Sequence, residues 1–105
     1  MKGQRKNTSI TYEEVKLRRA KNPEVILLDV RSKQEYQEYH LPGSICIPLY
    51  HLEEQVEKRI PKDVEIIIYC QMGGRSKTAV KLLTKMGYQN VCQIEGGLDA
   101  MQRKK

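Results

Sequence analysis

Two uninterrupted apolar runs constrain the fold of this chain more than any other feature of its sequence. The runs are Val25–Leu28, which leads directly into Asp29, and Ile66–Tyr69, which leads directly into Cys70. Apolar residues that do not alternate with polar ones are typical of strands covered on both faces, as in a parallel sheet. Three weaker segments are predicted as further strands, namely Ser9–Thr11, Ser44–Ile47 and Asn90–Ile94.

The segments between these strands have the patterns of helices. Thr11 and Ser32 are each followed three residues later by Glu, which predicts a capped helix start at both places. In the clearest helix, apolar residues recur at helical spacing and Gly87 supplies a left-handed stop. The helices are predicted over 11–21, 32–40, 49–60 and 75–86, with a last one from 97. Strands that alternate with helices predict an α/β fold with a mainly parallel sheet.

The length and the charge distribution limit the function. The chain has 105 residues, enough for one domain, and a formal net charge of +6. Six basic side chains lie at the two ends, however, and residues 7–102 carry equal numbers of basic and acidic side chains. We therefore expect basic tails at 1–8 and 102–105 around one domain at 9–101, and no nucleic-acid partner. Because neither a membrane-spanning run nor a secretory signal is visible, the expected location is cytoplasmic, without a membrane partner.

The three cysteines are best explained as independent thiols. Their number is odd, and Cys46, Cys70 and Cys92 show no CxxC or clustered Cys/His spacing. This argues against a disulfide framework and against a structural zinc site. Cys46 and Cys92 lie inside apolar strand patterns and are expected to be inert core residues.

Cys70 instead begins a segment with the parts of an anion-binding thiolate site, the cysteine loop (Cys70–Ser76). Gly73 and Gly74 allow a tight turn, and the following helix presents unpaired amides and the positive end of its dipole. Arg75 adds a cation, and Ser76 is placed to donate its hydroxyl to the sulfur or to cap the helix. Helix N-termini and nearby cations favour the thiolate form of a cysteine, which then needs no separate general base. The same amides would hold an oxyanionic substrate.

The residues after the first apolar run are expected to support this site. The ends of parallel strands meet at one edge of a sheet, where ligands bind, so Asp29 and Arg31 are predicted near the cysteine loop. Asp29 is expected mainly as a structural carboxylate that holds the next loop, and the alternative is that it pairs with Arg31 or with amides at the rim of the site. His40 is expected to be a packing or turn residue, and Tyr50 and His51 are placed to line the pocket.

On these residues the chain resembles a single-domain rhodanese over roughly residues 9–101. Three ordered motifs carry the resemblance: Leu28–Arg31 with Glu35-Tyr36 and His40–Pro48, then Tyr69–Ser76, then Gly87–Val91 with Glu95–Gly97. The resemblance implies a rhodanese-like five-stranded, mainly parallel sheet flanked by helices on both faces. It also implies that Cys70 takes a sulfur atom from a donor such as thiosulfate and passes it, as a persulfide, to cyanide or a thiol, including a protein thiol. No metal or organic cofactor is implied.

The resemblance also suggests which residues touch the substrate. By the family's motif, the backbone amides from Gln71 through Met72, Gly73, Gly74 and Arg75 to Ser76 cradle the persulfide, and Arg75 holds the loop or the anion. The chain departs from the family pattern in two places. Gln71 and Met72 stand where active loops often carry a second basic residue, and Leu98 and Met101 replace two tryptophans, which puts part of the pocket wall in doubt.

Two other functions remain open from the sequence. Related phosphatases use a C-x5-R loop to surround phosphate, whereas this chain has the shorter C-x4-R, which leaves less room for a phosphoryl group. A binding or regulatory module without turnover is the second alternative, because the loop has a single charge and the tryptophans are missing.

Overall fold

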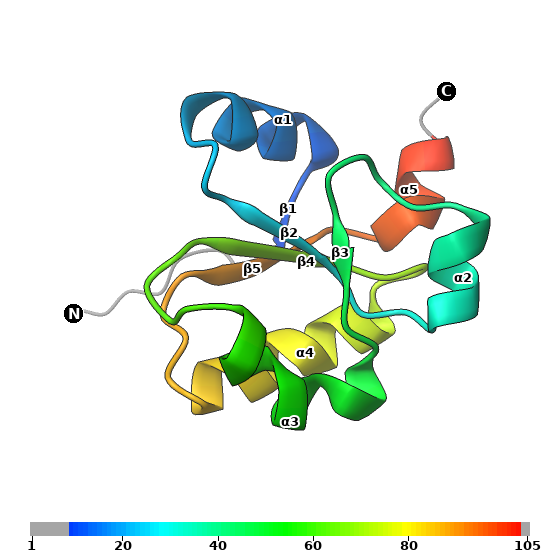
Figure 1. Ribbon diagram of the computed structural model, residues 1–105. Helices are drawn as coiled ribbons and strands as arrows, with labels where there is room; N and C mark the ends of the chain where they lie inside the picture. Colours follow the sequence, from blue (N-terminus) through cyan, green and yellow to red (C-terminus); the bar gives the residue numbers. More distant parts are fainter. Residues whose placement is uncertain (1–8, 104–105) are drawn as a thin grey trace.

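Five parallel strands form one sheet at the centre of the computed structural model, which describes residues 9–103 (Figure 1). Every ladder in the sheet is parallel, and the spatial order is β1-β5-β4-β2-β3. The strands are β1 (Ser9–Ile10), β2 (Ile26–Asp29), β3 (Ile45–Cys46), β4 (Ile66–Tyr69) and β5 (Val91–Ile94). The predicted fold class and all five predicted strands are therefore confirmed.

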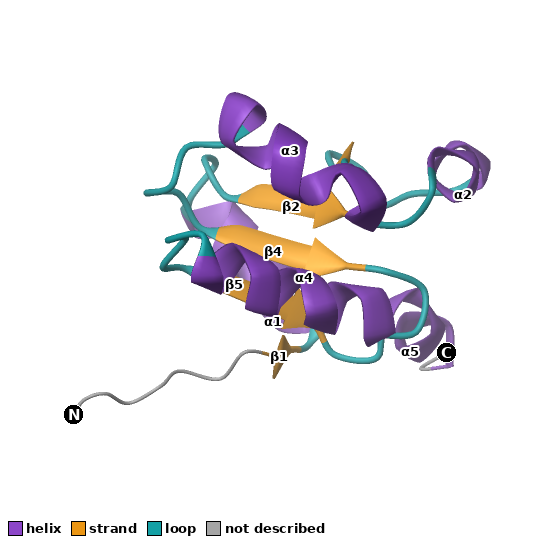
Figure 2. Cartoon of the chain, turned by 90° about the horizontal axis from the view of Figure 1, so that it is seen from below, coloured by secondary structure: helices purple, strands orange, loops and turns teal. Residues whose placement is uncertain are grey.

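Helices cover both faces of this sheet. Figure 2 shows α3 and α4 together on one face, and Figure 1 shows α1 and α5 on the other side. The short α2 lies beyond the carboxyl ends of the strands (Figure 2). The helices are α1 (Tyr12–Lys21), α2 (Lys33–Glu38), α3 (Leu49–Arg59), α4 (Gly74–Lys85) and α5 (Gly97–Arg103).

The central position of β4 explains its uninterrupted apolar sequence. Its side chains alternate between the two faces, and each face contributes to a separate core cluster. Ile66 and Ile68 pack with residues of α3 and α4, whereas Ile67 and Tyr69 pack with residues of α1 and α5. All four residues are fully buried, which explains why the run contains no charged residue. Cys70 continues the alternation on the α3–α4 face.

Local capping sets the helix boundaries much as predicted. The Thr11 side chain accepts a hydrogen bond from the Glu14 amide, and Ser32 and Glu35 form a complete capping box. Gly87 follows α4 with a φ of +102°, the left-handed conformation expected of a helix stop. The predicted tail at 1–8 and the last two residues of the tail predicted at 102–105 lie outside the described residues. No helix within residues 9–103 is long and apolar enough to cross a membrane.

Tyr69 ties the central strand to the segment that leads into β3. Its hydroxyl accepts a hydrogen bond from the Leu41 amide at 3.1 Å and lies 3.0 Å from the Ser44 hydroxyl, which in turn donates to the Leu41 carbonyl. Burial raises the pKa of Tyr69 to about 12, so the phenol stays protonated. The phenol therefore satisfies buried polar groups that no water would reach.

We expect Tyr69→Phe to lower the free energy of unfolding by about 1–3 kcal/mol, because the Leu41 amide loses its acceptor inside the protein. The measurement is urea unfolding followed by circular dichroism. Tyr50→Phe is the matched control, since the Tyr50 side chain is almost fully exposed. Equal unfolding free energies for Tyr69→Phe and the wild type would contradict this account of the segment before β3.

Candidate functional site

The cysteine loop turns backbone amides toward the sulfur of Cys70. Sγ accepts hydrogen bonds from the amides of Gly73, at 3.1 Å, and Ser76, at 3.3 Å. Gly73 has a φ of +112°, which permits the sharp turn from β4 into α4. The sulfur thus lies against the first turn of α4, where unpaired amides and the helix dipole favour negative charge.

Ser76 contacts the sulfur, but its proton is used elsewhere. Its Oγ lies 3.5 Å from Sγ and donates to the side-chain carbonyl of Gln93, with the Gly73 carbonyl as a second acceptor. Because a hydroxyl has one proton, Ser76 in this arrangement accepts from the Cys70 thiol. Gln93 was not among the residues predicted for the site. Its signal was a polar residue within the apolar run of β5, where it is buried.

Arg75 lies at the rim of the site and is bound to a carboxylate. Its guanidinium donates to both oxygens of Glu35, at 2.7 and 3.1 Å. The hydrogen bond from Arg75 is the largest of the effects that lower the pKa of Glu35 to about 2. The sequence indicated Glu35 as a helix-capping residue and as part of a family motif, but not as the partner of Arg75. The positive charge predicted for this loop is therefore largely offset by a residue of α2.

Asp29 and Arg31 form a buried ion pair beside the loop. The two side chains are connected by several hydrogen bonds, the shortest at 2.8 Å, and both are almost completely buried. Arg31 also donates to the Tyr39 carbonyl, at 2.6 Å, and to the side-chain oxygen of Gln71, at 3.3 Å. Arg31 thus reaches the cysteine loop by its contact with Gln71. Asp29 thus makes the pairing with Arg31 that was the alternative expectation, and its carboxylate also accepts from the Arg31 amide in the segment after β2.

The N-terminus of α5 packs against the back of the loop. The amides of Leu98 and Asp99 donate to the carbonyls of Cys70 and Gln71, at 3.1 and 2.9 Å, and the Asp99 carboxylate accepts from the Gln71 side chain. Gly97 has a φ of +65°, and a Cβ there would lie 2.5 Å from the Cys70 carbonyl oxygen. Only glycine fits this close approach, which the sequence analysis did not foresee.

Two expectations about neighbouring residues need correction. Leu98 is buried in the core cluster on the α1–α5 face, with Met101 packed against it. The replacement of tryptophan by these two residues therefore changes the packing of that cluster and not the wall of the pocket at Cys70, because Cys70 lies on the opposite face of the sheet. Gly74 is the first residue of α4 and has no positive φ, and a Cβ there would meet no atom within 4 Å. Gly73 alone makes the sharp turn.

A shallow pocket opens above the loop, with a volume of about 630 Å³. Met72 stands at its edge with 72% of its surface exposed. The lining residues are Leu49, Cys70, Gln71, Met72, Gly74, Arg75 and Thr78. Of the loop residues predicted for the site, all but Gly73 and Ser76 line this pocket. The amides of Gly73 and Ser76 contact the sulfur from within the loop.

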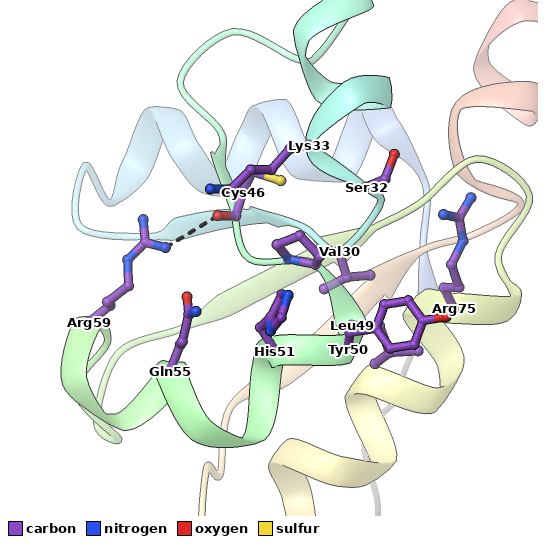
Figure 3. Close-up of a pocket in the computed structure, with 11 residues that line it drawn as sticks. Val30, Ser32, Lys33, Cys46, Leu49, Tyr50, His51, Gln55, Arg59 and Arg75 are labelled. Atoms are coloured by element: carbon purple, nitrogen blue, oxygen red, sulfur yellow. Dashed lines mark hydrogen bonds between the residues drawn. The ribbon is translucent and has the colours of Figure 1, made fainter.

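A second, larger cavity, the groove, adjoins this pocket and shares Leu49 and Arg75 with it (Figure 3). Tyr50 and His51 were expected to line the pocket at Cys70, but they line this groove instead, as does Cys46. The expectation of an inert core is therefore wrong for Cys46, which is only partly buried because β3 has two residues and forms the edge of the sheet. Cys92 is buried, and burial raises its pKa to about 11.

The remaining polar candidates have structural contacts. The His40 ring stacks on Tyr36, with 3.8 Å between the ring centroids, and its Nδ1 lies 2.8 Å from the Tyr36 carbonyl. His40 is thus a packing residue, as expected. Within residues 9–103, no three His, Cys, Asp or Glu side chains are close enough together to hold a metal ion.

Comparisons with known proteins agree on one family. A family model described as a rhodanese-like domain matches residues 11–104. The chain is similar to the adenylyltransferase and sulfurtransferase uba4 of Ogataea parapolymorpha, with 36% identity over 94% of this chain, although it spans only 24% of that protein. It is 38% identical to the thiosulfate sulfurtransferase PspE of Escherichia coli over 68% of each chain. The crystal structure of a rhodanese-like domain protein from Staphylococcus aureus superposes with a TM-score of 0.80, at 28% identity over 89% of each chain.

We expect Gly97→Ala to destabilise the protein by at least about 2 kcal/mol, because the new Cβ meets two loop carbonyls in a left-handed conformation. Gly74→Ala is the matched control. It adds the same methyl group where nothing lies within 4 Å, and we expect no loss of stability or a small gain. Urea unfolding measures both variants. A Gly97→Ala protein as stable as Gly74→Ala would refute the proposed docking of α5 on the loop.

The pair between Glu35 and Arg75 should make stability depend on acid pH. The pKa of Glu35 is lowered from 4.5 to about 2, so the pair stabilises the fold above pH 4.5 and this stabilisation is lost as the pH falls toward 2. Because the side chains of Glu35 and Arg75 are 33% and 41% exposed, solvent screening limits the effect to about 1 kcal/mol or less.

Glu35→Gln tests this dependence and keeps a residue that can serve in the capping box. We expect the difference in unfolding free energy between the wild type and Glu35→Gln to shrink between pH 4.5 and pH 2. The control is Glu53→Gln, which removes an exposed carboxylate of α3. A difference for Glu35→Gln that is constant over this range would show that the pair does not titrate as described.

Proposed function

Because the chain belongs to the rhodanese-like family, we propose that it is a sulfurtransferase in which Cys70 carries the transferred sulfur as a persulfide. One observation carries this proposal. The Sγ atom accepts two backbone amide hydrogen bonds at the N-terminus of α4, beneath a pocket that opens above the loop. Such an arrangement favours a sulfur atom that bears negative charge at both stages of a transfer.

The first step is attack by the Cys70 thiolate on the outer sulfur of a donor such as thiosulfate. A new S–S bond forms to Sγ, the S–S bond of thiosulfate breaks, and sulfite leaves with the bonding electron pair. The product is a Cys70 persulfide with its negative charge on the terminal sulfur. In the second step a thiol or cyanide attacks that sulfur, and the electron pair returns to Sγ.

The loop residues have separate parts in this proposal. The amides of Gly73 and Ser76 hold Sγ, and the amides of Gln71, Met72, Gly74 and Arg75 remain for the terminal sulfur and the departing anion. Asp29 and Arg31 act as supports, since Arg31 is fixed by Asp29 and contacts the Gln71 side chain. Arg75 contributes less attraction than a free cation would, because Glu35 is bound to it.

Thiosulfate is proposed as a donor on two grounds. A relative that is 38% identical is named a thiosulfate sulfurtransferase. The pocket is also lined by residues without a carboxylate, so no acidic side chain of its lining repels a dianion. The paired state of Arg75 nevertheless predicts a weak attraction, and we expect persulfide formation to require a high thiosulfate concentration.

We expect the protein to gain the mass of one sulfur atom on incubation with thiosulfate, and to lose it again on treatment with a small thiol. Intact-mass spectrometry measures both changes. Cys70→Ser should abolish the gain, whereas Cys46→Ser and Cys92→Ser, which remove the other two thiols, should retain it. A sulfur gain that survives in Cys70→Ser, or no gain with any of several sulfane donors, would overturn the proposal.

A binding or regulatory module without turnover is a second candidate, and the pairing of Arg75 with Glu35 favours it, because the loop then lacks a free positive side chain. The pH dependence of Cys70 alkylation by iodoacetamide separates the two. Rapid alkylation at neutral pH supports the transferase, since it shows a thiolate. Alkylation that becomes rapid only above about pH 8.5, the range of an ordinary thiol, supports the module.

A further inference from the structure

The groove beside the catalytic pocket is larger than a small sulfur donor needs. Its volume is about 850 Å³, and it lies between α3 and the segments that carry Lys33 and Cys46 (Figure 3). It meets the pocket above Cys70 at Leu49 and Arg75, which line both. A molecule held in the groove would therefore lie next to the sulfur that the protein transfers.

The charges of the groove favour an acidic occupant. None of the described residues that line it is Asp or Glu, whereas Lys33, Arg59, Arg75 and His51 are among them. The charge of Arg75 is offset by Glu35, and Nδ1 of His51 lies 3.8 Å from Oε2 of Glu54, so both of these basic groups have a carboxylate neighbour. Neither Lys33 nor Arg59 forms an ion pair with another residue of the described range, so their charges are available to a ligand.

Lys33 and Arg59 face the same stretch of the groove although they belong to different helices. Burial raises the pKa of the Cys46 thiol, and the positive charges of Lys33 and Arg59 both act against this rise. Arg59 also donates a hydrogen bond to the Cys46 carbonyl at 3.3 Å, which fixes its guanidinium at the groove wall (Figure 3). The two cations therefore flank one position, beside Cys46.

The length of the groove indicates a polypeptide. Leu49 and Arg59 are the first and last residues of α3, an 11-residue helix, and such a helix is about 16 Å long. An extended chain covers that distance with about five residues. A small thiol at Cys70 could not reach the charges of Lys33 and Arg59. The lining also includes apolar Val30, Pro48 and Leu49, which a peptide's side chains can cover.

We infer that the groove binds an extended acidic segment of a protein whose cysteine thiol accepts the sulfur from Cys70. This inference rests on the proposed sulfurtransferase function and names the acceptor class for it. The acceptor cysteine lies at the Leu49 end, and acidic residues follow it toward Lys33 and Arg59. Nucleic acid fits less well, because two available cations are few for a phosphate backbone.

The transfer step is a thiol exchange. The peptide thiolate attacks the terminal sulfur of the Cys70 persulfide and forms a new S–S bond to it. The bond between that sulfur and Sγ breaks, and the electron pair stays on Sγ as the Cys70 thiolate. The peptide then carries the persulfide and its negative charge, so no external oxidant or reductant is needed.

Peptide binding tests the groove without any sulfur chemistry. The probe is a fluorescent synthetic peptide with one cysteine followed by about five residues, most of them glutamate, and the comparison peptide has glutamine at each glutamate. Fluorescence anisotropy with the full chain measures both dissociation constants. We expect the acidic peptide to bind at least about tenfold more tightly than the glutamine peptide, with the difference shrinking in high salt.

Charge reversal locates the binding site. Arg59→Glu, alone or with Lys33→Glu, should weaken binding of the acidic peptide by about tenfold or more. Lys85→Glu is the matched control, because it reverses an exposed basic residue of α4 that lines neither hollow, and it should bind as the wild type does. Equal binding by Arg59→Glu and Lys85→Glu would overturn the inference.

Sulfur transfer distinguishes failure of this inference from failure of the proposed function. In persulfidated protein, Arg59→Glu should slow transfer to the acidic peptide and leave transfer to 2-mercaptoethanol unchanged. If no persulfide forms on Cys70, the proposed function fails. The binding measurements still show in that case whether the groove binds an acidic peptide. Displacement of the peptide by a short single-stranded RNA at lower concentration than by polyglutamate would overturn the inference in favour of nucleic acid.

Discussion

In the cysteine loop, the planar trans peptide bond couples the direction of each carbonyl to the direction of the next amide. The carbonyls of Cys70 and Gln71 accept hydrogen bonds from the backbone of α5. Because C=O and N–H of a trans peptide unit point in opposite directions, this docking turns the amides of Gln71 and Met72 away from α5. The amides of Gly73 and Ser76 meanwhile bind Sγ. The direction of the loop's donors thus depends on a helix outside the loop, and on the absence of a Cβ at Gly97.

Under our proposal, fixed backbone dipoles rather than side-chain charges hold the charge of the sulfur, because two amides donate to Sγ directly. Arg31 is bound to Asp29 and Arg75 to Glu35, so both guanidinium groups near the loop have a carboxylate partner. Amide dipoles act over a short range, which suits the binding of a single charged sulfur atom but attracts a distant anion weakly. Under our proposals, the cations that attract a partner from a distance lie in the neighbouring groove, where neither Lys33 nor Arg59 forms an ion pair with any residue of 9–103. The attraction of the partner would then come from the groove, and the sulfur transfer would take place at the adjacent cysteine loop.

The sequence was informative wherever the determining contacts are local or periodic. The apolar run of β4, the capping residues Thr11 and Ser32 and the stop at Gly87 predicted the sheet and most helix boundaries. The contacts that shape the site join residues far apart in the chain, such as Glu35 with Arg75 and Ser76 with Gln93. The hydrophobic periodicity of the sequence does not predict such pairs. Cys46 was misjudged because an apolar neighbourhood predicts burial, whereas a two-residue strand at the edge of the sheet leaves one side uncovered.

The hydrogen bond between Ser76 and Gln93 bears on which groups hold the charge of the sulfur. If Ser76 turned its proton toward a Cys70 thiolate, the side-chain carbonyl of Gln93 would lose the hydrogen bond that Ser76 donates to it. An unsatisfied buried acceptor costs about 1–3 kcal/mol, which is as much as a hydrogen bond to a charged group returns. The amides of Gly73 and Ser76 incur no such cost, because they already point at Sγ. Under our proposal the backbone therefore stabilises the thiolate, whereas Ser76 accepts a hydrogen bond from the thiol form and keeps the loop joined to β5 through Gln93.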